Sequence, residues 1–249
     1  MLLLVVDTAG PTGGVLLARC NPGDEVGQDE SQILGAYGLH PRAFSAELIP
    51  AIAELLQRNH LELDDVDGFA VVSGPGSFTG LRVGLSAVKA LAEATAKPIL
   101  TVSRLAILAS VAARMELRES AGMPVHVVLD AGRGEFYHGI YRDEGETCVR
   151  ESFETLESLT AGIHHPHGVV VASEPAVWNA LAGMNGIDAR EMPAATVQDV
   201  LPLACTVWRA GDFHDPASVD ANYLRRSDAI VTAKLAGIEQ PVHRQRREP

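Results

Sequence analysis

The chain has 249 residues, of which 47% are hydrophobic and 21% charged, and its formal net charge is −12. A chain of this length buries roughly 70 to 75% of its unfolded surface, so a substantial core is available. The acidic balance argues against a stand-alone nucleic-acid binder, because affinity for phosphates requires clusters of Lys and Arg. No apolar run approaches the ~20 residues of a membrane span, and the first residues lack the pattern of a signal peptide, so we expect a cytoplasmic protein with no membrane partner.

The first half of the chain predicts three strands followed by alternating helices and strands. Apolar runs bounded by Gly and Pro turns predict strands at 2–8, 13–19 and 31–39. Residues 45–56 carry apolar side chains at helical spacing, although Pro50 removes a backbone hydrogen bond, so we expect a kink or a helix beginning only a turn earlier. The same patterns then predict a strand, a helix and a strand at 69–73, 79–96 and 98–102.

The second half repeats this scheme. A helix is predicted at 103–117 and another at 196–210. Between them the pattern predicts strands at 125–130, 135–142, 148–153 and 168–172 and a short helix at 156–161. We therefore expect an N-terminal lobe of residues 1–102 that is completed by residues 196–226, a C-terminal lobe of residues 103–195, and a flexible tail, 227–249.

Each half opens with a hairpin whose first strand ends in an aspartate, Asp7 or Asp130. Duplicated ββαβα-type units of this kind place the two aspartates at one cleft between two lobes. The pattern predicts the two-lobed α/β fold of actin, the sugar kinases and the heat-shock ATPases, which is ribonuclease H-like in each lobe.

The run from Gly74 to Gly84, GPGSFTGLRVG, is a rigid turn that leads from a strand directly into a helix rich in small residues. The N-terminus of such a helix can hold an anion, while small residues allow close packing. The run contains neither the Lys-Ser/Thr pair of a Walker loop nor the Gly-x-Gly-x-x-Gly of dinucleotide sites. The turn therefore predicts either an anion cradle or a close-packed interface.

The candidate cofactor-binding residues are Asp7, Thr8, Gly76 and Ser77. A strand-end carboxylate can hold hydrated Mg²⁺ against phosphate oxygens, but capping of a backbone turn is the favoured interpretation for Asp7 and Asp130. Ser77 lacks a recognisable activating base, so an N-cap is favoured over a nucleophile there.

Clusters elsewhere favour structural roles. The segment His164 to His167 has metal-like composition but lacks nearby ligands at suitable spacing, so a surface loop is favoured. Cys20, Cys148 and Cys205 form no CxxC pair and are predicted to be small buried hydrophobic residues. The basic stretch His243 to Arg247 is interpreted as a solvated terminus, with a contact to RNA or an acidic partner as the alternative.

Four segments together resemble the TsaB (YeaZ) family: the opening VVDT, the GPGSFTG-x-R turn, the hairpin Leu129 to Tyr137, and the closing Asn222 to Arg225. The resemblance extends from the first strand to about Arg226. It implies a non-catalytic subunit of the bacterial machinery that makes N6-threonylcarbamoyladenosine at position 37 of tRNAs reading codons that begin with A.

The resemblance also implies the partners. TsaD carries the metal and transfers the threonylcarbamoyl group, TsaE is an ATPase of the complex, and tRNA is reached through the complex. TsaB forms a heterodimer with TsaD and a homodimer when isolated. The isolated chain is expected to need no cofactor, with ATP or ADP as candidates at the complex interface.

In the catalytic relatives, a His-x-x-x-His pair on the first helix binds the metal. Phe44 stands here four residues after His40, and Pro41 interrupts the helix between them. Phe cannot donate to a metal, so we expect no metal at this place and no catalytic residue in this chain.

The partner-binding face is predicted on the helices at 45–56 and 79–96, because two apolar stripes on neighbouring helices supply the dry centre of an interface. Its predicted residues are Ser45, Leu48, Ile49, Ile52, Thr79, Gly80, Arg82, Gly84, Leu85 and Val88. Internal packing of the small residues is the alternative. The competing function is that of an enzyme acting alone, either an ATP-dependent phosphotransferase or a metallopeptidase, and its support is the cleft with its two aspartates.

Overall fold

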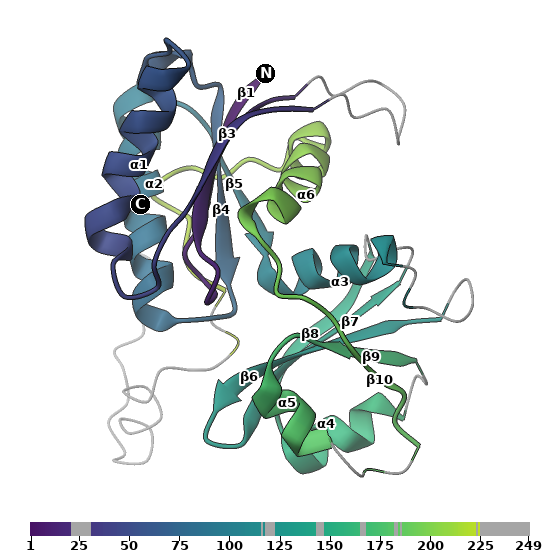
Figure 1. The fold of residues 1–249 in the computed structure, drawn as a ribbon. Coiled ribbons are helices and arrows are strands. Elements are labelled where there is room, and N and C mark those ends of the chain that lie inside the picture. Colours follow the sequence, from purple (N-terminus) through teal and green to yellow (C-terminus); the bar gives the residue numbers. More distant parts are fainter. Residues whose placement is uncertain are drawn as a thin grey trace, which may run out of the picture.

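The chain folds into two lobes, each built on a five-stranded sheet (Figure 1). The computed structural model describes residues 1–20, 31–115, 117, 123–142, 147–164, 168–181, 184, 186–222 and 224. The tail 227–249 and the segment 165–167 of the histidine cluster lie outside the described residues. Among the described helices, none combines the length and the apolar character that a membrane crossing requires.

The first sheet has the order β3-β2-β1-β4-β5. β1 is antiparallel to β2 and parallel to β4, and β5 is parallel to β4. The strands are β1 (Leu2–Asp7), β2 (Gly14–Arg19), β3 (Gln32–Gly38), β4 (Gly68–Gly74) and β5 (Ile99–Ser103).

The second sheet repeats this topology in the order β8-β7-β6-β9-β10. β6 is antiparallel to β7 and parallel to β9, and β10 is parallel to β9. The strands are β6 (Val125–Gly132), β7 (Glu135–Arg142), β8 (Thr147–Thr155), β9 (Val169–Ala172) and β10 (Ala189–Glu191). The predicted duplicated α/β fold is therefore confirmed.

Helices cover both faces of each sheet (Figure 1). α1 (Phe44–Arg58) and α2 (Phe78–Thr95) lie on the outer face of the first sheet, and α6 (Val197–Ala210) lies on its other face. α3 (Arg104–Arg114) lies between the lobes and packs on the second sheet, whose opposite face carries α4 (Leu156–Ile163) and α5 (Pro175–Leu181). A 3₁₀ turn, η1, spans Leu63–Asp65.

The predicted helices and strands are confirmed to within about three residues at most ends. α1 continues through Pro50, which is exposed together with Ala46, so the carbonyl group left without a helical partner lies on the solvent side. Three short elements, α5, β10 and the 3₁₀ turn η1, were not predicted. Cys20 and Cys205 are buried as expected, but the prediction for Cys148 is wrong, because this residue is exposed on the edge strand β8.

α2 lies directly on the end of β1. The Thr8 side chain is fully buried, and its hydroxyl donates to the Gly80 carbonyl at 2.8 Å. A Cβ atom at Gly80 would overlap the Thr8 carbonyl oxygen, and one at Gly84 would overlap the Thr8 hydroxyl. The small residues at these two positions therefore serve internal packing.

Two buried histidines pack between the second sheet and α4. His126 and His138 are both fully buried, and Nδ1 of His126 lies 2.9 Å from Nε2 of His138. Burial, followed by the charges of His126 and Arg150, lowers the pKa of His138 to about 3, although Glu154 acts in the opposite direction. This lobe therefore holds His138 as a neutral ring.

The close contact of α2 predicts that Gly84→Ala destabilises the chain. Alanine favours a helix by about 1 kcal/mol over glycine, whereas overpacking a buried contact costs about 1–3 kcal/mol. The overlap with Thr8 is with a fully buried hydroxyl that is held by its hydrogen bond to Gly80, so overpacking wins and the net loss is up to about 2 kcal/mol. Urea unfolding measures this loss, with Ser86→Ala on the exposed side of α2 as the control; a more stable Gly84→Ala variant would contradict the packing argument.

The buried His138 predicts acid sensitivity. In the unfolded chain the His138 ring binds a proton below about pH 6.5, whereas in the folded chain it binds one only below about pH 3. The free energy of unfolding therefore decreases as the pH falls from about 6.5 to about 3, by at most about 1.4 kcal/mol per pH unit. Unfolding free energies at pH 7, 6 and 5 should show a shallower slope for His138→Leu than for the wild type. His164→Ala, on an exposed ring, is the control; equal slopes in the wild type and His138→Leu would refute the assignment.

Candidate functional site

The structure separates the predicted interface residues on α1 and α2 into two groups. Six of the ten predicted residues lie in the core of the first lobe, so the prediction is wrong for them: Leu48, Ile52, Gly80, Gly84, Leu85 and Val88. Their sides of the helices face the first sheet, whose strands cover them. A partner cannot reach these residues without unfolding the lobe.

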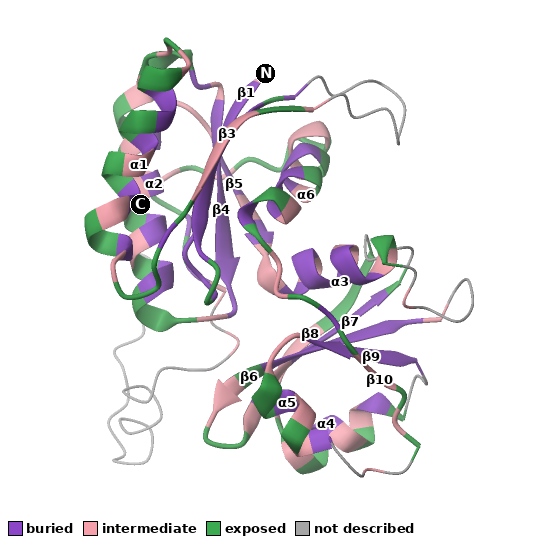
Figure 2. Ribbon diagram, in the orientation of Figure 1, coloured by how far each residue is buried: buried purple, intermediate pink, exposed green. Residues whose placement is uncertain are grey.

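The other four predicted interface residues are exposed: Ser45, Ile49, Thr79 and Arg82. The Ile49 side chain stands out because half of its surface is open to solvent. The Arg82 guanidinium lies over the Phe78 ring at 3.8 Å from its centroid, which holds both side chains on the outer surface at the start of α2. Figure 2 shows the exposed outer sides of α1 and α2 in green.

A cavity of about 380 Å³ lies between the lobes. Its walls come from the turn after β1, the start of α2, the start of α3 and the hairpin of β6 and β7. The lining residues are Ala9, Gly10, Pro11, Pro41, Gly76, Ser77, Arg104, Asp130, Ala131, Tyr137 and Glu174. Of the four candidate cofactor residues, the structure brings Gly76 and Ser77 to this cleft, whereas Asp7 and Thr8 are buried and are not among its lining residues.

The two strand-end aspartates cap backbone turns, as favoured from the sequence. Asp7 accepts from the Ala9 N–H at 2.8 Å, and Asp130 accepts from the Gly132 N–H at 2.9 Å. Burial raises the pKa of Asp7, while hydrogen bonds from Ala9 and Gly10 and the charge of Arg104 act against that shift. Ser77 is the N-cap of α2, because its hydroxyl accepts from the Gly80 N–H.

An ion pair spans the cleft. The Arg104 guanidinium lies 3.0 Å from the Glu174 carboxylate, and only 12% and 21% of these side chains are exposed. The second oxygen of Glu174 accepts from the Asp130 N–H at 2.6 Å. The guanidinium also lies against Gly10, so this one cation contacts both lobes.

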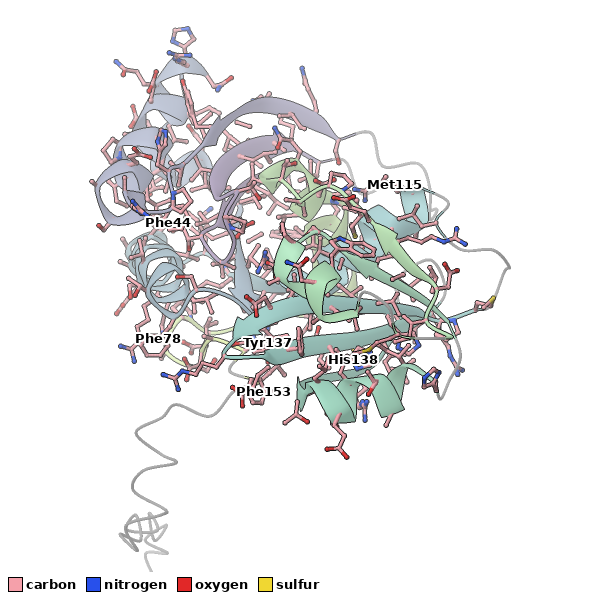
Figure 3. The ribbon with its side chains drawn as sticks, turned by 60° about the horizontal axis from the view of Figure 1, so that its bottom comes forward. Phe44, Phe78, Met115, Tyr137, His138 and Phe153 are labelled. Carbon is pink, nitrogen blue, oxygen red and sulfur yellow. The ribbon has the colours of Figure 1, made fainter. Side chains whose placement is uncertain are left out.

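Sequence reasoning missed Arg104, Glu174 and Tyr137. Arg104 directly follows β5, and Glu174 follows β9 by two residues, so a charged residue just after a predicted strand was the available signal. Tyr137 contacts Phe153 of β8, with ring centroids 5.9 Å apart (Figure 3). This aromatic pair lies on the second lobe beside the cleft.

The two positions compared above with the metal-binding pair of the catalytic relatives, His40 and Phe44, lie in a surface turn and in the packed core. Phe44 is buried against Gly13 and Gly80 at the start of α1 (Figure 3). His40 lies before the helix, is largely exposed and contacts Glu47 at 3.1 Å. Within the described ranges, no group of three or more His, Cys, Asp or Glu side chains is arranged to hold a metal ion.

The family model and the curated relatives that match this chain belong to the same group of proteins. Residues 28–189 match the family model described as TsaD: tRNA N6-adenosine threonylcarbamoyltransferase. The Escherichia coli protein named tRNA threonylcarbamoyladenosine biosynthesis protein TsaB is 27% identical over 96% of this chain and 100% of its own length. The Bacillus subtilis protein of the same name is 31% identical over 57% of this chain and 56% of its own length.

A solved structure from Pseudomonas aeruginosa, described as an uncharacterized protein with similarity to peptidase YEAZ, has a TM-score of 0.71 and 27% identity. The match covers 90% of this chain and 99% of that one. The structural match, the coverage of nearly the whole length and the sequence matches therefore indicate the same family. The chain belongs to the TsaD family of tRNA N6-adenosine threonylcarbamoyltransferases and, within it, to the TsaB (YeaZ) proteins.

Proposed function

We propose that this chain is a non-catalytic subunit that docks a TsaD-type partner and thereby activates N6-threonylcarbamoylation of adenosine 37 in tRNAs that read codons beginning with A. The observation that carries the proposal is the exposed, largely uncharged side of α1 and α2 in a member of this family. The docking surface is defined here as the exposed residues Ser45, Ala46, Ile49, Pro50 and Ala53 of α1 and Thr79, Arg82, Ser86 and Ala90 of α2.

The composition of this docking surface suits a protein partner. The docking-surface residues of α1 carry no charge, the half-buried Glu47 beside them is paired with His40, and Arg82 is the one charged member on α2. Interface centres are depleted in Lys, Glu and Asp, whereas Arg is enriched there, so the absence of acidic members and the presence of Arg82 both fit a protein interface. Small residues such as Ala46 and Ala90 also allow a partner helix to approach closely.

The wider assembly is part of the same proposal. TsaE and tRNA join through the complex, with ATP or ADP at the joint between subunits, in the cytoplasm. In the absence of TsaD, the docking surface pairs two copies of this chain.

The second candidate function is an enzyme acting alone, a phosphotransferase or a metallopeptidase. The interlobe cavity with Asp130 in its wall favours it. Against it, the cation Arg104 and the anion Glu174 neutralise each other within the cleft, and Asp7 is buried in a backbone turn. Arg104 and Asp7 are therefore already engaged within the protein and offer little charge to bind the phosphates or the Mg²⁺ ion of a nucleotide.

We predict that Ile49→Asp abolishes docking but not folding. Placing a carboxylate at the centre of a dry interface costs at least about 2 kcal/mol, or about 30-fold in affinity. Val149→Asp on β8 is the matched control, because Val149 is 49% and Ile49 is 50% exposed. Titration of each folded variant with purified TsaD measures the loss.

The same pair of variants tests the cellular role. In cells depleted of the natural protein, Val149→Asp should restore threonylcarbamoyladenosine in bulk tRNA and Ile49→Asp should not. Wild-type affinity of Ile49→Asp for TsaD would show that the docking surface is misassigned. Normal levels of the modified nucleoside after complete removal of the protein would reject the function itself.

The enzyme alternative has its own test. Calorimetry of the isolated chain with ATP and Mg²⁺ should give no binding with a Kd below about 1 mM, the weak end of useful affinity. Tight binding accompanied by phosphate transfer to a small acceptor would instead favour the phosphotransferase.

A further inference from the structure

We propose that two glutamates of the second lobe, Glu151 and Glu174, form an internal clamp that fixes the angle between the lobes without a ligand. Glu151 accepts from two residues of the first lobe, and Glu174 holds the Arg104 guanidinium at the start of α3, where that guanidinium also packs against Gly10 of the first lobe. The clamp is defined as Glu151 with Ser103 and Asn222, and Glu174 with Arg104. In other two-lobed folds, closure around a bound ligand commonly sets this angle.

Glu151 is the first half of the clamp. One of its oxygens accepts from the hydroxyls of Ser103 and Tyr141, and the other accepts from the Asn222 side-chain amide at 2.8 Å. Burial and the nearby Glu151 charge raise the pKa of Tyr141, so the phenol stays protonated and donates. A carboxylate that receives several donors in a partly buried place holds them firmly, since charge-assisted hydrogen bonds are the stronger kind.

Two of the three donors to Glu151, Ser103 and Asn222, are held by the first lobe, whereas Tyr141 belongs to β7 of the second. Ser103 is the last residue of β5 and pairs with Gly74 of β4. The Asn222 backbone N–H donates to the Ser73 carbonyl at 2.8 Å, and the chain just before it is held by Lys89, whose ammonium donates to the Val219 carbonyl at 2.8 Å. Glu151 therefore connects β8 to the end of the first sheet and to the C-terminal segment.

Glu174 is the second half. Its partner Arg104 adjoins Ser103 in the chain, so neighbouring residues at the crossing point between the lobes each bind a glutamate of the second lobe. Arg104 also packs against Gly10 at the end of β1, and Glu174 also holds the Asp130 N–H at the end of β6. The ion pair therefore joins the ends of the two strands that flank the cleft. A change of lobe angle would break the Glu151 contacts to Ser103 and Asn222 and would pull the Arg104 guanidinium, held by Glu174, away from Gly10.

Spin labels on the two lobes test the clamp in the full-length chain. The label positions are Glu93→Cys on α2 and Glu157→Cys on α4, both exposed, in a Cys148→Ser background that removes the exposed native thiol. Labelled protein is diluted with unlabelled copies, so that only distances within one chain are measured. The clamp predicts one narrow distance distribution, unchanged by ATP and Mg²⁺.

The double variant Glu151→Ala/Glu174→Ala should broaden this distribution at least about twofold, because the hinge then samples several angles. Asp188→Ala is the matched control, since its ion pair with Arg190, at 3.0 Å, lies within one lobe. Arg104→Leu removes the Glu174 half of the clamp and should broaden the distance distribution to an intermediate width. This single variant is used for the test if the double variant does not fold. An unchanged width in the folded clamp variants, or a wild-type distribution that narrows on adding nucleotide, would overturn the proposal.

Discussion

The contact between α2 and the end of β1 determines the arrangement of the first lobe. Gly76, Gly80 and Gly84 lie where a Cβ atom would overlap Ala9 or Thr8, so the helix can approach the strand only because these side chains are missing. This approach seats the inner side of α2 on the sheet and leaves its outer side exposed. The same helix places Gly76 and Ser77 in the wall of the cleft. These three glycines thus let α2 approach the sheet closely, which places Gly76 in the wall of the cleft and fixes the position of the proposed docking surface.

Most of the fold could be predicted because burial follows a regular period. In β6, Val127 and Leu129 face α3 while Val128 faces α4 and α5, and the sequence shows the same apolar runs and turns twice. The short elements α5 and β10 escaped prediction because seven and three residues are too few to establish a period. The duplication made the pairing of the strands predictable, since each unit repeats the same order.

The candidate site was harder to predict, for a physical reason. Periodicity identifies the apolar side of a helix, but not whether a sheet or a partner covers it. Leu48 and Leu85 were therefore assigned to an interface although the lobe's own sheet covers them, whereas Ile49, one residue farther along α1, is the exposed one. The ion pair of Arg104 with Glu174 joins residues 70 positions apart, and no local pattern links them.

α2 lies between the cleft and the proposed docking surface. Its first turn borders the cleft through Ser77, and its outer side presents Arg82 one turn later. A surface that is already rigid before its partner arrives loses less conformational freedom on binding, so more of the contact energy remains as affinity. For the docking subunit proposed above, an internal clamp would supply a fixed shape in place of ligand-driven closure.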